Sequence, residues 1–71
     1  MQYFKCTSGD FIKILTPNCE SIMPNSIWRV LGEGWDDGAG MPCLIIAGHD
    51  IWGNENPERD WYCDDDDYII I

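Results

Sequence analysis

The chain has 71 residues, of which 13 are acidic and four are basic, so its formal net charge at pH 7 is −9. This charge excludes nucleic acid and anionic membrane surfaces as direct partners, because both would repel the chain, and it favours a protein with a basic surface. A chain this short buries only about 60% of its unfolded surface, which predicts one small domain over residues 1–71. Its hydrophobic content of 45% is enough for a single core.

The N-terminal stretch has no cationic segment followed by an apolar one, and no apolar run approaches the roughly 20 residues that cross a bilayer. We therefore expect a cytoplasmic protein, in the host cytoplasm if a phage encodes it. The four cysteines are Cys6, Cys19, Cys43 and Cys63. Without a signal peptide, reduced thiols packed in the core are favoured over disulfides, and the absence of a Cys-x-x-Cys pair disfavours structural zinc.

The first half of the chain is rich in β-forming residues that are interrupted by turn residues. Its predicted strands cover residues 3–7, 11–15 and 27–31. Residues 8–10, Ser-Gly-Asp, are typical of a turn, and residues 23–26, Met-Pro-Asn-Ser, are typical of a tight reversal. Between them, residues 16–21 are expected to form a loop, where Pro17 would deny a strand one ladder donor.

The second half alternates between apolar runs and acidic or glycine-rich stretches. Its predicted strands cover residues 41–47, 60–63 and 68–71. The apolar run at residues 43–46 is continuous, as in a strand buried on both faces. Residues 32–40 are expected to form a flexible surface loop, and residues 48–59 a long loop or an irregular hairpin. Residues 64–67 are expected to form a single helical turn.

Five or so short strands in a chain of this size predict an all-β fold curled into a small barrel, because a flat sheet would leave open edges and one bare face. Residues 23–31, MPNSIWRVL, and residues 61–71, WYCDDDDYIII, resemble two landmarks of small SH3-like barrels. The landmarks are a turn that launches a strand, and a one-turn 3₁₀ element before a final strand that pairs with the first. Short bacterial and phage proteins of this kind, mostly of unknown role, open with a lysine–cysteine strand similar to Lys5-Cys6. The resemblance implies a five-stranded SH3-like barrel.

The chain departs from the peptide-binding SH3 domains in two motifs. The Ala-Leu-Tyr-Asp-Tyr type of opening is missing, and only Tyr68 matches the Pro-Ser-Asn-Tyr type of 3₁₀ turn. The resemblance therefore implies a fold, and it implies neither a polyproline groove nor an activity.

Most of the acidic residues lie in the second half of the chain. From Glu33 to Asp67 there are eleven acids and one cation, Arg59, whereas the first 32 residues hold two acids and three cations. Two interpretations remain open: a solvated face that only keeps the protein soluble, or a recognition surface for a basic site that normally holds nucleic acid. The second requires the acidic loops to lie beside residues 64–67. The candidate partner-binding acids are Glu33, Asp36, Asp37, Glu55, Glu58, Asp60, Asp64, Asp65, Asp66 and Asp67.

The four tryptophans divide by their surroundings in the sequence. Trp35 and Trp52 lie in polar stretches and are candidate partner-binding anchors, because affinity often centres on a few exposed aromatic residues. Trp28 and Trp61 lie in predicted strands and are expected in the core or in the wall of a groove.

No pattern in the chain predicts catalysis, a cofactor or a dedicated metal site. Residues 64–67 lack the Asp-x-Asp-x-Asp-Gly spacing of a calcium loop. His49 is the only histidine, and the acids beside Cys63 disfavour its thiolate. The Gly32-x-Gly34 segment is acidic and would repel phosphate. We therefore expect no enzyme.

Together these patterns predict a non-enzymatic protein-binding module. Its concrete form would be a phage-type inhibitor or nucleic-acid mimic that occupies a basic site on a host protein. The alternative is a structural or accessory subunit whose acidic face only confers solubility.

Overall fold

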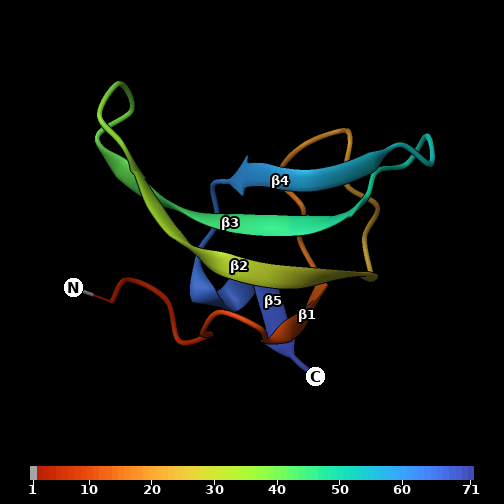
Figure 1. The fold of residues 1–71 in the computed structure, drawn as a ribbon, viewed down its shortest axis with the longest axis horizontal. Helices are drawn as coiled ribbons and strands as arrows, with labels where there is room; N and C mark the ends of the chain where they lie inside the picture. The colour runs from red at the N-terminus through yellow and green to blue at the C-terminus, as the bar shows by residue number, and fades with distance from the viewer. Residues whose placement is uncertain (1) are drawn as a thin grey trace.

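A computed structural model describes residues 2–71, which form one antiparallel five-stranded sheet and a single 3₁₀ turn (Figure 1). The elements are β1 (Phe11–Ile14), β2 (Ser26–Asp36), β3 (Met41–His49), β4 (Glu55–Trp61), η1 (Asp65–Asp67) and β5 (Tyr68–Ile70). The strand order is β4-β3-β2-β1-β5, so β4 and β5 are the two edges and the sheet does not close on itself. The predicted all-β class, and the 3₁₀ turn before the last strand, are confirmed.

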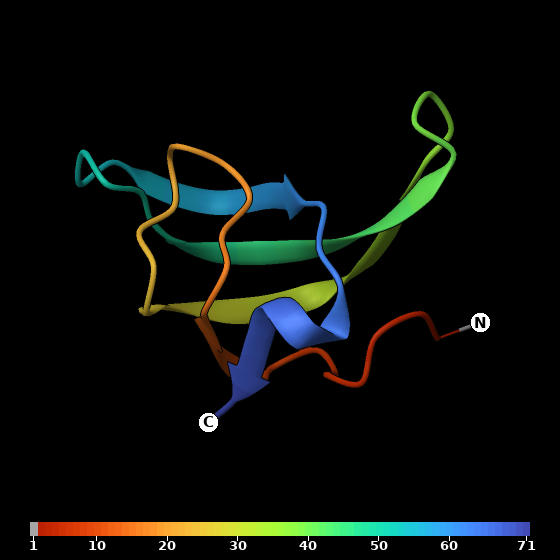
Figure 2. The same cartoon turned by 180° about the vertical axis from the view of Figure 1, so that it is seen from behind.

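The sheet is strongly curved, and one side of it is covered by irregular chain. In Figure 1, β2, β3 and β4 run side by side, with β1 and β5 below them. Figure 2, from behind, shows the loop between β1 and β2 passing over this curved layer, with η1 and β5 beneath it. Strands β1 and β5 pair antiparallel, with Ile12 opposite Ile70. The core therefore lies between the curved sheet and these covering segments.

In β1 and in the first part of β2, side chains point alternately into the core and away from it, and the inward-facing ones fill the core. Ile12 and Ile14 point inward and are fully buried, and Trp28 and Val30 do the same from β2. The buried hydrophobic residues are Phe4, Cys6, Ile12, Ile14, Ile22, Trp28, Val30, Cys43, Leu44, Ile46, Trp61, Cys63 and Tyr68. The predicted burial of Trp28 and Trp61 is thus confirmed.

The strand predicted at residues 3–7 is wrong. This segment is irregular, and two acidic side chains take the place of a neighbouring strand. The amides of Tyr3 and Phe4 donate to the carboxylate of Glu33, and the amide of Lys5 donates to Asp65. The hydrophobic residue Phe4 is buried there. A segment can bury a side chain without forming the backbone hydrogen bonds of a sheet, so its β-forming composition did not imply a strand.

The loop predicted at residues 32–40 is also wrong in extent. Strand β2 continues to Asp36, and only residues 37–40 form the turn into β3. A register shift between Val30 and Gly32 interrupts the alternation of side chains there, as in a β-bulge. Beyond the bulge the hairpin projects past the core (Figure 1), so its strands need not follow the pattern of a half-buried sheet.

Of the two alternatives predicted for residues 48–59, a long loop or an irregular hairpin, the structure forms the hairpin. Strand β3 runs to His49 and β4 begins at Glu55, so the strand predicted at residues 60–63 is the end of a longer one. Pro57 is tolerated because β4 is an edge strand, where a missing ladder donor can face solvent. The other predicted strands and the 3₁₀ turn are confirmed to within a few residues.

Candidate functional site

The ten acidic residues predicted to bind a partner divide into two groups in the structure. Four are half-buried and accept hydrogen bonds from other parts of the chain: Glu33, Asp36, Asp65 and Asp67. Six are exposed: Asp37, Glu55, Glu58, Asp60, Asp64 and Asp66. The first group holds the fold together, and the second presents its charge to solvent.

Glu33 in β2 fixes the N-terminal segment against the sheet. Its carboxylate accepts the N–H of Tyr3 at 3.0 Å to each oxygen, and the N–H of Phe4 at 2.8 Å. Hydrogen bonds to an ionised acceptor are stronger than neutral ones. The contact therefore keeps Phe4 in the core, and it occupies both oxygens of the Glu33 carboxylate within the chain.

Asp36 organises the tip of the β2–β3 hairpin. Its carboxylate accepts the N–H of Gly38 at 2.8 Å and of Ala39 at 3.2 Å, and the hydroxyl of Tyr62 at 2.5 Å. The Tyr62 hydroxyl, followed by the Ala39 and Gly38 amides, lowers the pKa of Asp36 below its ordinary value. The hairpin tip is thus tied to the segment that follows β4.

We expect the contact between Asp36 and Tyr62 to persist over a wide range of pH. The hydrogen bond to Asp36, followed by burial, raises the pKa of Tyr62 from 10.0 to about 12. Because the pKa of the Tyr62 phenol is raised, the hydrogen bond contributes its full stabilisation of the folded state below pH 10. This contribution is lost as the pH rises through about 12. The lowered pKa of Asp36 means that its stabilisation is present above its unfolded pKa and is lost as the pH falls through the folded one.

The titration of Tyr62 can be followed through its ring carbons by NMR. In the wild-type protein, we expect a midpoint near pH 12. In the Asp36→Asn variant the midpoint should fall towards 10, because the anionic acceptor is gone. An unchanged midpoint in this variant would show that the contact does not form.

The four consecutive aspartates alternate in role around η1. Asp65 accepts the N–H of Lys5 at 3.2 Å and the hydroxyl of Tyr68 at 2.6 Å. Asp67 accepts the N–H of Asp64 at 2.8 Å and Nδ2 of Asn18 at 3.0 Å. Asp64 and Asp66 are exposed. The tetrad is therefore not a uniform charged cluster, and two of its members fasten the turn to the N-terminal segment and to the loop after β1.

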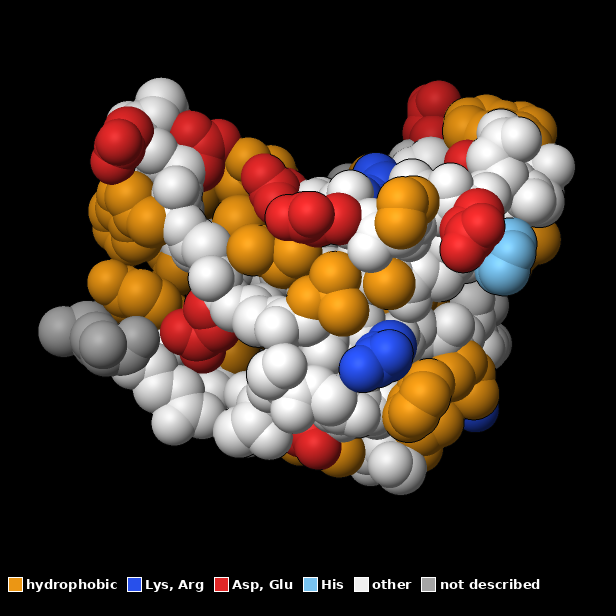
Figure 3. Space-filling view, in the orientation of Figure 1, with side chains coloured by type: hydrophobic (Ala, Val, Ile, Leu, Met, Phe, Trp, Pro, Cys, Tyr) orange, Lys and Arg blue, Asp and Glu red, His pale blue; other side chains and the backbone are white. Residues whose placement is uncertain are grey.

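The six exposed acids are spread over three places. Glu55, Glu58 and Asp60 lie in the edge strand β4, and Asp37 lies at the tip of the β2–β3 hairpin. Asp64 precedes η1, and Asp66 lies within it. Figure 3 shows acidic side chains on both raised ends of the molecule and in the hollow between them. Because η1 adjoins β5 at the other edge of the sheet, the tetrad does not join the β4 acids in one continuous row along a strand.

The two predicted tryptophan anchors are both exposed. Trp35, 52% exposed, packs against Tyr3 with ring centroids 5.7 Å apart. Trp52, 67% exposed, lies in the turn between β3 and β4. Asp50 accepts the N–H of Trp52 at 3.0 Å and of Asn54 at 2.9 Å, which fixes this turn. The sequence argument did not assign Asp50 this role, although an Asp can accept the backbone N–H two residues further on, and Gly53 follows in the same turn.

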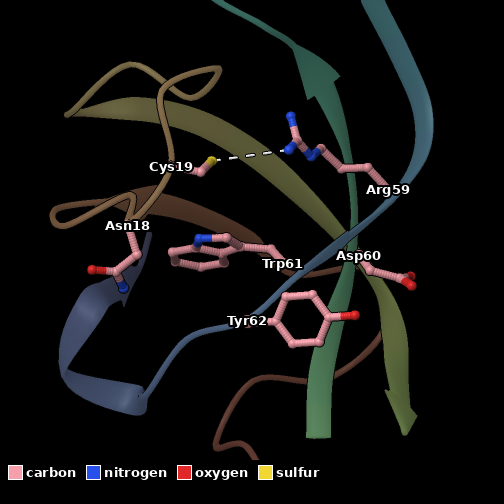
Figure 4. A pocket seen from close by; sticks show the side chains of 6 residues that line it. All are labelled: Asn18, Cys19, Arg59, Asp60, Trp61 and Tyr62. Atoms are coloured by element: carbon pink, nitrogen blue, oxygen red, sulfur yellow. Dashed lines mark hydrogen bonds between the residues drawn. The ribbon is translucent and has the colours of Figure 1, made fainter. Parts of the chain in front are cut away.

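A small open cavity lies beside β4, between its last residues and the loop after β1. Its volume is about 170 Å³, and Figure 4 shows the residues that line it: Asn18, Cys19, Arg59, Asp60, Trp61 and Tyr62. Arg59 donates to Oγ of Ser21 at 2.8 Å and lies 3.9 Å from Sγ of Cys19. The cavity is smaller than the roughly 300 Å³ at which pockets for small molecules begin. It could accommodate one side chain of a partner.

Three of the four thiols, those of Cys6, Cys43 and Cys63, are poor nucleophiles because of their position. All four cysteines are free, and only Cys19 is exposed. Burial, followed by the charge of Asp67, raises the pKa of Cys63 far above its ordinary value. Burial also raises the pKa of Cys6 and Cys43. Burial is therefore the main cause, and the like charge predicted from the sequence is a second one.

Among residues 2–71, no three His, Cys, Asp or Glu side chains are arranged so that they could hold a metal ion. The same residues contain no helix of the length and apolarity needed to cross a membrane. No family model, curated protein or solved structure matches the chain.

Proposed function

We propose that the protein is a non-enzymatic module that binds a basic surface on another protein. The main support for this proposal is that the acids fall into a half-buried group and an exposed group. Of the ten acids predicted to bind a partner, four hold the fold and six are exposed, on a chain of net charge −9. Exposed like charges repel one another and destabilise the compact state, whereas they attract a cationic partner and speed its approach.

Two exposed tryptophans would anchor the contact. Trp35 and Trp52 lie on the two hairpins that project from the sheet, and Figure 3 shows acidic side chains on and between these projections. In such an arrangement, the acids mainly raise the association rate, and buried aromatic anchors mainly slow dissociation. The partner surface would be a convex basic element that enters the hollow between the hairpins.

A concrete form of this function is an inhibitor that occupies the nucleic-acid-binding site of a host protein. The strand β4 supports it only in part. Residues two apart in a strand are about 6.6 Å apart, while each DNA strand carries a phosphate every 3.4 Å or so of helix axis. The acids of β4 are thus sparser than phosphates, and we favour recognition of a few Arg and Lys side chains over imitation of a whole duplex.

The fold class that we propose is an SH3-like barrel. Two features support it: the 3₁₀ turn η1 directly precedes the last strand, and that strand pairs with β1. The curvature of the sheet brings the covering segments across its concave side (Figure 2). This class carries no statement about the partner.

Neutralising exposed acids tests the proposed function. The variant D37N/E58Q/D60N/D66N removes four negative charges and leaves the four half-buried acids in place. We expect a partner captured from the native host by the wild-type protein to bind this variant about 30-fold more weakly at low salt, mainly through a slower association rate. Surface plasmon resonance at several salt concentrations measures both rates.

The matched control is D37E/E58D/D60E/D66E, which changes the same four positions and keeps their charge. It should bind within a few-fold of wild type, and both should lose affinity as salt rises. Equal binding by wild type and the neutralised variant, or binding insensitive to salt, would contradict the proposal. A neutralised variant that only precipitates more readily would support a purely solubilising role for the acids.

A further inference from the structure

The outer face of β1, β2 and β5 carries hydrophobic side chains that nothing in the described chain covers. One row across these strands is Ile27, Lys13 and Ile69, since Lys13 lies opposite both isoleucines. The next row contains Arg29 opposite Phe11. Ile71 adjoins Phe11, to whose carbonyl it donates a hydrogen bond of 3.0 Å. These rows lie on the face opposite the buried Ile12 and Ile14.

The hydrophobic members of these rows are about half exposed. The exposed fractions are 51% for Phe11, 53% for Ile27, 43% for Ile69 and 59% for Ile71. Together they present on the order of 400 Å² of apolar surface. This is the size of the largest patch on a typical monomer, roughly 300–600 Å², and such patches are often functional. One partner in a standard dimer interface contributes about 800 Å², of which some 60% is apolar. The patch therefore supplies most of the apolar area that such an interface needs.

The charge on this face is opposite in sign to that of the whole chain. Its two rows contain two of the four cations, Lys13 and Arg29, and no Asp or Glu side chain. Two copies of a chain with net charge −9 repel each other through their acidic surfaces. Their mutual approach costs least where acids are absent and where long cationic side chains can reach the partner's acidic rim.

The two edge strands of the sheet also differ in charge and in their protection against pairing with another chain. The edge strand β4 contains Pro57 and four charged residues, which are the usual protections against pairing with another chain. The edge strand β5, with the sequence Tyr-Ile-Ile, contains neither proline nor charge. The unprotected edge and the hydrophobic face thus lie together on one side of the molecule.

We propose that a second copy of this chain covers the outer face of β1, β2 and β5, with the two β5 edges near the axis of a symmetric dimer. Phe11, Ile27, Ile69 and Ile71 form its hydrophobic centre, and Lys13 and Arg29 lie around it. This interface is separate from the acidic surface proposed to bind a partner, so the dimer would present two copies of that surface.

Sedimentation equilibrium under reducing conditions tests the dimer, the reductant preventing a disulfide through exposed Cys19. The mass should rise with concentration from 8.2 kDa towards twice that value. The dimer dissociation constant should fall as salt rises, because salt screens the repulsion between the copies. This is the reverse of the salt effect expected for the acidic surface, so the failure of either proposal can be told from failure of the other.

The variant F11D/I69D should raise the dissociation constant at least about 100-fold. The control M41D/I51D adds the same two charges at exposed hydrophobic positions, one at the start of β3 and one in the β3–β4 turn, and it should dimerise nearly as well as wild type. Near-ultraviolet circular dichroism checks that each variant is folded, and Ile69→Ser replaces the double variant if that one unfolds. A mass of 8.2 kDa at every concentration and salt level, or equal loss of dimer in variant and control, would overturn the proposal.

Discussion

The Gly48→Ala variant is expected to lose about 3 kcal/mol of unfolding free energy, a large part of the stability of a domain this small. A Cβ atom at position 48 would lie 2.6 Å from two atoms of the Trp28 indole. Trp28 is 1% exposed and its Nε1 donates to Oγ of Ser26 at 2.9 Å, so the ring cannot move aside without breaking its own packing. Chemical denaturation, or a thermal midpoint lowered by roughly 10 °C or more, would measure the loss.

Gly32→Ala is the matched control, because it adds the same methyl group to a glycine in a neighbouring strand. A Cβ atom at Gly32 meets no atom within 4 Å. Alanine is favoured over glycine within a strand by roughly 0.5–1 kcal/mol, so this variant should be as stable as wild type or slightly more stable. Equal stability of the Gly48 and Gly32 variants would mean that the Trp28 ring does not lie against β3.

The Trp61→Ala variant should lose about 3–5 kcal/mol, because it removes a large buried side chain and leaves a cavity. Trp61 is 2% exposed, packs edge-on against Tyr68 with ring centroids 6.1 Å apart, and donates from Nε1 to the carbonyl of Pro17 at 2.6 Å. The hydrogen bond fixes the loop after β1 over the core. Trp61→Phe, which keeps an aromatic ring and loses this donor, should fall between wild type and the alanine variant.

Trp52→Ala provides the comparison, since it removes the same side chain from an exposed turn. Its effect on stability should stay within about 0.5 kcal/mol. Under the proposed function it should instead weaken partner binding, which separates folding from recognition. A loss of stability as large as that of Trp61→Ala would place Trp52 in the core and would contradict the structure.

The strands that could be predicted from the sequence are those whose side chains enter the core. In β1 and early β2, every second residue is buried, as with Ile12, Ile14, Trp28 and Val30, so period and burial agree. In the projecting β2–β3 hairpin, no core requires alternate side chains to be hydrophobic. The glycines and acids of residues 32–40 therefore predicted a loop where β2 continues to Asp36. At residues 3–7 a strand was predicted where the structure has irregular chain. The backbone amides of this segment bond to the side chains of Glu33 and Asp65 and not to a neighbouring strand.

The sequence predicted which residues make up the acidic surface. It did not predict which of them accept hydrogen bonds within the chain and which are exposed. Glu33, Asp36, Asp65 and Asp67 accept hydrogen bonds from distant or turn amides and hydroxyls. Nothing in a one-dimensional run of acids distinguishes these four from their neighbours. The distinction depends on which backbone amides lack a ladder partner, and that is known only once the chain is folded.

The pairing of β5 with β1 also has a consequence for the order in which the protein folds during synthesis. Ile12 and Ile70 lie opposite each other but are separated by nearly the whole chain. The hairpins β2–β3 and β3–β4 can form as soon as their own residues leave the ribosome, because their contacts are local. Strand β1 can pair with β2 early, but its other edge must wait for β5 and stays open in the nascent chain. During that interval, the growing polypeptide is most exposed to aggregation and to proteases.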